Sequence, residues 1–93
     1  MSDRGWGTPV ERERRNRIRV AVYAFAYECR DEALISDDEY DRLARSINPT
    51  MVTGNPVIDM FFQHHYSPDT AMWIHKHPAL RGIAGIYSRW YIQ

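Results

Sequence analysis

The residues that could carry chemistry begin with an acidic run, DDEYD, from Asp37 to Asp41. Ser36 directly precedes this run and Glu39 follows three residues later, which is the spacing of a capping box at the start of a helix. Acidic side chains in a first turn also interact favourably with the positive end of the helix dipole. Capping accounts for Ser36 and Glu39, and the dipole accounts for the acids, but neither accounts for Tyr40 beside Asp41.

Two other groups of reactive side chains give weaker signals. Four histidines, His64, His65, His75 and His77, fall close together, but no two have the four-residue spacing that puts two metal ligands on one helix face. Cys29 lies on the apolar stripe of a predicted helix, where we expect a buried, unreactive thiol. There is no nucleophile-elbow serine and no glycine-rich phosphate loop. The sequence therefore predicts no metal site and no catalytic residues.

One stretch, YAFAYECRDEALISDDEYDRLARSI from Tyr23 to Ile47, resembles the N-terminal Ia domain of bacterial NAD-dependent DNA ligases. The signature of that family is an aromatic-rich helix ending in Tyr-His, a short loop, and then I-[SP]-D-x-E-Y-D-x-L. Here the last part is ISDDEYDRL, from Ile35 to Leu43, and the spacing back to Tyr27 fits without a gap. The resemblance covers little more than a quarter of the chain.

In these ligases the Ia domain binds the nicotinamide mononucleotide (NMN) half of NAD, so the resemblance implies ligand-binding roles for Tyr27, Asp37, Tyr40 and Asp41. Tyr23 lies four residues before Tyr27 on the same flank of its helix, and the two rings can touch. Tyrosine faces can hold the positively charged nicotinamide ring by stacking and cation–π attraction, while carboxylates offset its charge and accept hydrogen bonds from ribose hydroxyls. The implied ligand is NMN or NAD, and no cofactor is required.

The chain departs from the ligases at positions that bear on activity. Glu28 stands where the family has a histidine, and an anionic side chain there repels a phosphate. The connecting loop, residues 31–34, lacks the family's proline. The chain also has no K-x-D-G lysine to accept AMP, and no OB-fold, zinc or helix-hairpin-helix region. We therefore expect a non-catalytic binding protein, and favour this over a role as the nucleotide-capturing subunit of a split ligase.

Composition and charge limit the classes of partner. The chain has 93 residues, is 44% hydrophobic and 26% charged, and carries no formal net charge, which is ordinary for a folded domain. Residues 1–30 carry a net charge of +3, residues 31–60 carry −5, and residues 61–93 carry +2. In the Arg-rich run ERERRNRIR, residues 11–19, glutamates are interleaved with arginines. This pattern indicates a solvated helix face with internal ion pairs rather than a nucleic-acid-binding surface.

The sequence also predicts the compartment. No apolar run approaches the roughly 20 residues needed to span a bilayer, so we expect no membrane partner. The N-terminal residues MSDRGWGTP lack the apolar core of a signal peptide. A single cysteine excludes an internal disulfide framework. Together these features predict a cytoplasmic protein.

The elements that position these residues are predicted to be helices. No glycine or proline interrupts residues 10–48, and apolar residues recur at helical spacing at Ile18, Val22, Phe25 and Cys29. We expect a first helix from about residue 9 to about residue 30, and a second from Ser36 to near residue 46. They should form an antiparallel hairpin.

Three shorter helices are predicted further along the chain, each beginning at a proline: Pro56, Pro68 and Pro78. The expected fold is all-α, a compact single domain of four to five helices over residues 10–93. A flexible arm, residues 1–9, precedes it because that segment has two glycines and a proline without periodicity.

The C-terminal half is rich in aromatic residues, more than a small core is expected to hide. We expect several of them to form a protein-binding face: Phe61, Phe62, Trp73, Trp90 and Tyr91. Two functions therefore remain open. The hairpin binds a nicotinamide nucleotide, or the aromatic C-terminal face binds another protein, as in small phage or mobile-element accessory and inhibitor proteins. In the second case the hairpin tyrosines pack at the turn and the aspartates face water.

Overall fold

The computed structural model describes residues 7–91, without the side chain of Tyr91, and all regular secondary structure in this part of the chain is helical. The elements follow in the order α1 (Pro9–Arg30), α2 (Asp37–Ser46), α3 (Pro56–His65), a 3₁₀-helix η1 (Met72–Lys76) and α4 (Leu80–Tyr91). The predicted all-α fold of four to five helices is confirmed. Residues 1–6 of the predicted arm lie outside the described residues, and α1 already begins at Pro9.

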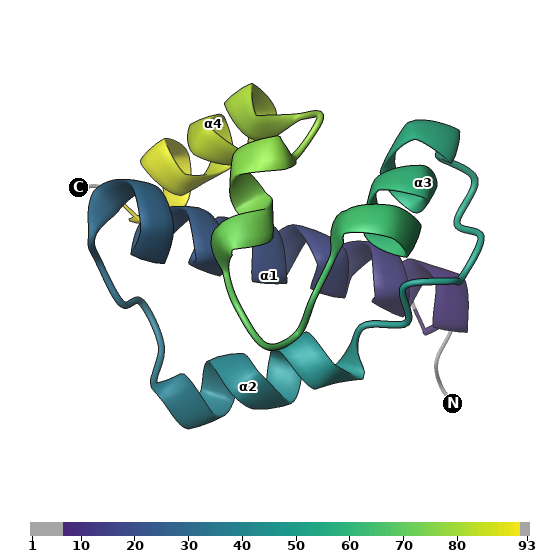
Figure 1. The fold of residues 1–93 in the computed structure, drawn as a ribbon, viewed down its shortest axis with the longest axis horizontal. Coiled ribbons are helices and arrows are strands. Elements are labelled where there is room, and N and C mark those ends of the chain that lie inside the picture. The colour runs from purple at the N-terminus through teal and green to yellow at the C-terminus, as the bar shows by residue number, and fades with distance from the viewer. Residues whose placement is uncertain (1–6, 92–93) are drawn as a thin grey trace.

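α1 is the central helix, with α2 on one side and η1 and α4 on the other (Figure 1). The Thr8 side chain caps its start by accepting a hydrogen bond from the backbone N–H of Glu11 (3.2 Å), and Pro9 occupies the first turn. The helix ends at Asp31, whose φ of 54° is left-handed, and the backbone N–H of Glu32 donates to the carbonyl of Ala26 (2.9 Å). The predicted limits of this helix are confirmed.

α2 runs back antiparallel to α1, which confirms the predicted hairpin (Figure 1). The capping box is present: the backbone N–H of Glu39 donates to Ser36 Oγ (3.1 Å), and that of Ser36 donates to Glu39 Oε1 (3.1 Å). Further along α2, the Tyr66 hydroxyl donates to the carbonyl of Ala44 (2.7 Å). α2 is thus fixed locally at its start and by a tertiary contact near its end.

The buried face of α1 differs from the predicted stripe. Val22 and Phe25 are buried as expected, but Ile18 is 46% exposed and Cys29 is exposed. The helix instead turns its small residues toward its neighbours, including three alanines that are fully buried: Ala21, Ala24 and Ala26. The buried residues of α1 end at Ala26, and Cys29 lies beyond them in the last turn, so the prediction of a buried thiol is wrong.

A buried charged cluster connects α1 to the chain that follows α2. Arg17 is 3% exposed; its guanidinium donates to Glu13 Oε2 and Asp59 Oδ1 (both 2.8 Å), and to the carbonyls of Asn48 (2.8 Å) and Met51 (3.1 Å). Glu13 also accepts from the backbone N–H of Asn48 (3.0 Å). The expected ion pairing within the Arg-rich run is present here. The expected solvated face is wrong for Glu13 and Arg17, because both are buried and bond to polar groups of residues 48–59.

Two of the three proline-initiated helices begin later than predicted. α3 begins at Pro56 with Asn55 as its cap, as expected. After Ser67, however, side chains take up backbone donors: Ser67 Oγ accepts from the N–H of Asp69 (3.2 Å) and Thr70 Oγ1 from that of Met72 (3.1 Å). Such local bonds compete with helix formation. The segment therefore forms turns and then the 3₁₀-helix η1, and α4 starts at Leu80 rather than at residue 78.

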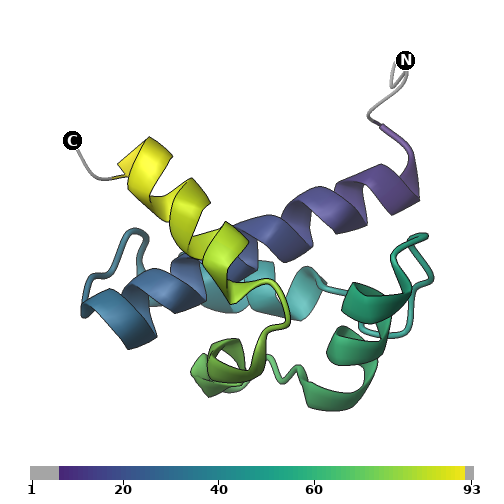
Figure 2. The ribbon, with the colours of Figure 1, turned by 90° about the horizontal axis from the view of Figure 1, so that it is seen from above.

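Most of the aromatic residues expected on a protein-binding face lie in the core. Phe61, Phe62 and Trp73 are 5%, 0% and 4% exposed, and the ring centroids of Phe62 and Trp73 lie 5.8 Å apart. They are interior because η1 packs against α1 and α4, while α3 lies beside it (Figure 2). Trp90 is 67% exposed, and the side chain of Tyr91 lies outside the described residues. No helix within residues 7–91 combines the length and hydrophobicity needed to cross a bilayer.

Candidate functional site

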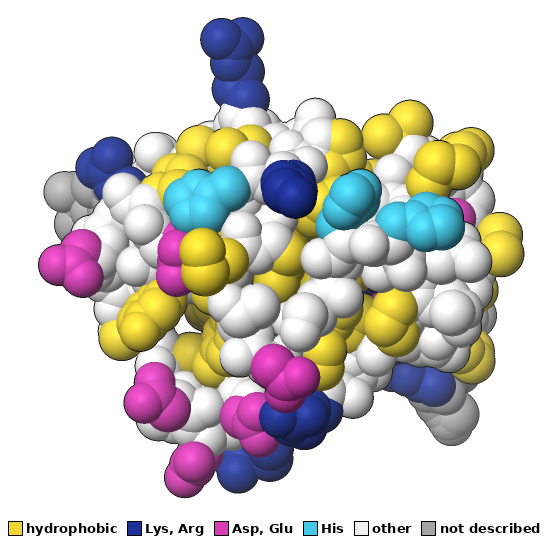
Figure 3. Space-filling model, viewed as in Figure 1, with side chains coloured by type: hydrophobic (Ala, Val, Ile, Leu, Met, Phe, Trp, Pro, Cys, Tyr) yellow, Lys and Arg dark blue, Asp and Glu magenta, His cyan; other side chains and the backbone are white. Residues whose placement is uncertain are grey.

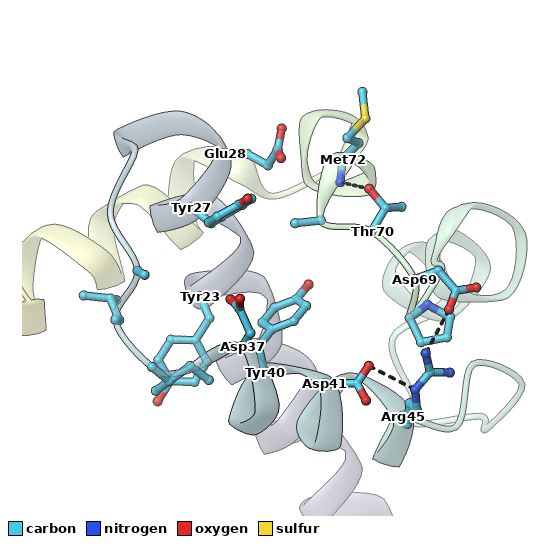
Figure 4. Close-up of a pocket in the computed structure, with 15 residues that line it drawn as sticks. Tyr23, Tyr27, Glu28, Asp37, Tyr40, Asp41, Arg45, Asp69, Thr70 and Met72 are labelled. Atoms are coloured by element: carbon cyan, nitrogen blue, oxygen red, sulfur yellow. Dashed lines mark hydrogen bonds and ion pairs between the residues drawn. The ribbon is translucent and has the colours of Figure 1, made fainter.

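A pocket of about 510 Å³ lies between the end of α1, loop residues 33–35, α2 and residues 68–72. We call it the tyrosine pocket. All five residues expected to bind a ligand line it: Tyr23, Tyr27, Asp37, Tyr40 and Asp41. α1 contributes two tyrosines one turn apart, and the capping box starts α2 so that its residues at positions 37, 40 and 41 share a face (Figure 4).

The tyrosines occupy different depths. Tyr27 is 58% exposed, whereas Tyr40 packs against the core and its hydroxyl oxygen is buried without a hydrogen-bond partner among the described residues. Burial raises the pKa of Tyr40 to about 12; the nearby indole N–H of Trp73 opposes this shift but does not complete a hydrogen bond. Tyr40 is therefore a neutral phenol at neutral pH. One fixed ring and one exposed ring are available to a ligand.

The lining is acidic. Four carboxylates and one guanidinium give it a net charge of −3, from Glu28, Asp37, Asp41, Asp69 and Arg45. Figure 3 shows acidic side chains gathered over α2, beside a hollow bordered by hydrophobic side chains. A pocket of this charge favours cationic ligands and disfavours anionic ones.

The single arginine of the lining is already engaged. Arg45 donates from Nε to Asp41 Oδ1 and from Nη2 to Asp69 Oδ1, both at 3.0 Å, and so links α2 to the segment before η1 (Figure 4). A phosphate would have to compete with two carboxylates for this guanidinium. Asp37, in contrast, has no ion-pair or hydrogen-bond partner in the described part of the chain, and it points toward the tyrosines (Figure 4). It is the carboxylate most available to a ligand.

Glu28 faces a histidine of η1. The distance from His75 Nε2 to Glu28 Oε1 is 3.1 Å, which joins the end of α1 to η1 at the edge of the pocket. His75 is half exposed, and its charge offsets that of Glu28 only when the ring is protonated. The structure thus gives Glu28 a histidine as its neighbour in space.

Sequence reasoning missed one wall of the pocket. The Asp41–Arg45 pair has a four-residue helical spacing that was visible in the sequence. No local signal pointed to residues 68–72, which reach the site through the packing of η1.

Of the four histidines, His64, His65 and His75 are exposed and His77 is buried. Within residues 7–91, no three His, Cys, Asp or Glu side chains are grouped so that they could hold a metal ion.

Comparison with protein-family models, curated proteins and solved structures finds no match for this chain. The geometry of the tyrosine pocket is therefore the basis for proposing a function. The pocket is within the roughly 300–1,000 Å³ typical of small-molecule sites. Its aromatic faces and carboxylates are suited to a flat, cationic ligand that carries hydroxyl groups.

Proposed function

We propose that this protein is a non-catalytic binder of a nicotinamide nucleotide, NMN or the NMN half of NAD, in the tyrosine pocket. The supporting observation is that the four residues singled out by the ligase resemblance, Tyr27, Asp37, Tyr40 and Asp41, line one pocket together with Tyr23.

The chemistry of the lining is consistent with this ligand. The oxidised nicotinamide ring is flat and positively charged, and it can stack on Tyr27 or Tyr40 while Asp37 offsets its charge. Each cation–π contact contributes about 0.5–1 kcal/mol where solvent reaches it. A small number of such contacts in an open pocket gives binding in the micromolar-to-millimolar range.

A role in binding rather than catalysis is supported by the absence of a lysine in the pocket. Lys76 is the only lysine in the sequence, and it does not line the tyrosine pocket. The protein would sense or sequester the nucleotide. We place this activity in the cytoplasm, where the exposed thiol of Cys29 would stay reduced.

Protein binding through the aromatic C-terminal face has less support. Three of the five residues expected on that face are core residues, namely Phe61, Phe62 and Trp73. Of the remaining two, the structure describes the side chain of Trp90 alone.

The test is an NMR titration of isotope-labelled protein with NMN, NAD and AMP. NMN and NAD should shift resonances of Tyr27, Asp37, Tyr40 and Asp41, and AMP should leave them unchanged because it lacks the cationic ring. Tyr27→Ala should abolish the NMN shifts with little effect on folding, since this side chain is mostly exposed. Trp90→Ala removes an equally exposed aromatic ring outside the pocket and should bind normally.

No shifts at millimolar NMN would refute the proposal. Equal shifts with AMP would also refute it, since the pocket would then not recognise nicotinamide.

A further inference from the structure

A second pocket, of about 340 Å³, lies between α1, α3 and α4 and shares no residue with the tyrosine pocket. Four isoleucines line it, Ile18, Ile58, Ile83 and Ile86, and we call it the isoleucine pocket. Small-molecule sites are typically apolar clefts of about this size with a small number of polar groups.

The pocket remains open at Gly82 on α4. A Cβ atom added to Gly82 would have no heavy atom within 4 Å outside its own helix backbone and chain neighbours. Glycine in a helix interior usually lowers stability relative to alanine, and a close approach of another element commonly explains its presence. No such approach exists at Gly82. The glycine therefore leaves space beside the isoleucines.

Five polar or charged residues are among those that line this pocket: Arg14, Arg17, Thr53, Asn55 and His77. Two of them, His77 and Arg14, have donors available to a ligand. His77 is 8% exposed, and its Nδ1 accepts a hydrogen bond from the backbone N–H of Ala79 (3.0 Å). Burial lowers the pKa of His77 to about 4, so the ring is neutral at neutral pH and carries its proton on Nε2. Nε2 has no hydrogen-bond partner among the described residues, and it is a donor without an acceptor.

The second polar group is a cation. Arg14 donates from Nε to the carbonyl of Thr53 (2.9 Å), and no carboxylate within the described residues forms an ion pair with it. Arg17 also lines the pocket but is already bonded to Glu13 and Asp59. Among residues 7–91, no acidic residue lines this pocket. His77 thus offers a neutral N–H to a ligand, and Arg14 offers a guanidinium that is bonded to Thr53 but has no ion-pair partner within the described residues.

We propose that the isoleucine pocket binds a small apolar molecule that carries one carboxylate. Its hydrocarbon part contacts the isoleucines, and its carboxylate accepts hydrogen bonds from Nε2 of His77 and from Arg14, which has no carboxylate partner within the described residues. This site is independent of the tyrosine pocket, and binding here neither requires nor follows from the binding of NMN.

The test compares three probes with the same hydrocarbon chain, octanoate, 1-octanol and octylamine, by NMR titration of the whole chain. Octanoate should shift resonances of Ile18 and Ile83, octanol should bind more weakly, and octylamine should not bind. Gly82→Leu fills the pocket and should raise the Kd for octanoate at least about tenfold. Gly85→Leu is the matched control: Gly85 has equal open space on α4 but does not line the pocket, so binding should be retained.

A second variant tests the carboxylate contact without filling the pocket. Arg14→Gln should weaken octanoate by about fivefold and leave octanol unchanged, because it removes a charge but keeps a donor for Thr53. The proposal is overturned if octanol or octylamine binds as tightly as octanoate, if Gly82→Leu binds like the wild type, or if no probe shifts the pocket resonances at millimolar concentration.

Discussion

At the scale of single residues, we expect Glu28 to disfavour a phosphate group in the tyrosine pocket, because both groups are anionic. Its neighbour His75 lies 3.1 Å away and is half exposed, so compensation by that histidine depends on protonation. Arg45, the cation of the lining, is held by two aspartates. We therefore expect the pocket to attract the nicotinamide ring of NMN and to repel the 5′-phosphate of the same ligand. Comparison of NMN with nicotinamide riboside, which lacks the phosphate, separates these effects.

We predict that Glu28→Gln raises the preference for NMN over nicotinamide riboside by about fivefold, because one partly exposed charge near the phosphate is worth about 1 kcal/mol. The amide keeps the size of the side chain and can still bond to His75. Dissociation constants for both ligands, measured by NMR or calorimetry at low salt, give the ratio. Asp38→Asn is the control, since it removes a charge from an exposed α2 residue outside the pocket. A similar change in the ratio for both variants would mean that net charge, rather than Glu28, controls selectivity.

At the scale of elements, the start of α2 positions three residues of the pocket. The reciprocal hydrogen bonds of Ser36 and Glu39 fix the first turn, and they lower the pKa of Glu39 because Ser36 donates to its ionised carboxylate. Tyr40 follows directly after this turn. The cap therefore fixes the direction in which the Tyr40 ring enters the pocket.

We expect Ser36→Ala to lower the free energy of unfolding by about 1 kcal/mol, because it leaves a backbone donor of the first turn unpaired. Ser36→Asn should retain most of that stability, since its side chain also caps helices well. Urea denaturation followed by circular dichroism measures both. If alanine and asparagine were equally stable, the capping box would be dispensable, and tertiary contacts such as that of Tyr66 with Ala44 would hold α2 instead.

Elements with strong local signals were predictable from the sequence. α1, α2 and the start of α3 each begin at a side-chain cap, and their predicted starts agree with the structure. The segment after Ser67 was predicted as a helix because Pro68 follows a serine that could cap it, but the Ser67 and Thr70 hydroxyls accept from the backbone donors of turns. The exposure of Cys29 and the burial of Arg17 were missed because both depend on which neighbour packs against α1.

At the scale of the whole molecule, the tyrosine pocket was predictable only in part. Its α1 and α2 walls come from one continuous stretch of sequence, which a resemblance can cover. The wall formed by residues 68–72 depends on how η1 folds back on α1, and no spacing in the sequence encodes that contact. The isoleucine pocket has no sequence signal, because it is formed by three helices that are distant along the chain.

The same packing of distant helices makes the stability of the whole molecule depend on pH through His77. Its ring lies among Phe61 and Phe62 (centroid distances 5.1 and 6.3 Å), and the charged residues that line the adjoining pocket, Arg14 and Arg17, are both cationic. Burial lowers the pKa of His77 from 6.5 to about 4. Between these values the unfolded chain binds a proton that the folded chain does not, so stability is complete above pH 6.5 and falls as the pH approaches 4.

We predict that the free energy of unfolding decreases by up to about 3 kcal/mol across this interval. His77→Asn should remove most of the decrease, because the amide oxygen can still accept from the N–H of Ala79 but does not titrate. His75→Asn, at an exposed histidine, should keep it. Below this pH range, protonation of Asp59 should lower the free energy of unfolding further. Burial alone would raise the pKa of Asp59, but hydrogen bonds from Thr53 and Arg17 lower that pKa below 3.8. Protonation of Asp59 therefore destabilises the fold. Urea denaturation at a series of pH values measures these changes, and parallel curves for wild type and His77→Asn would show that His77 is not the group responsible.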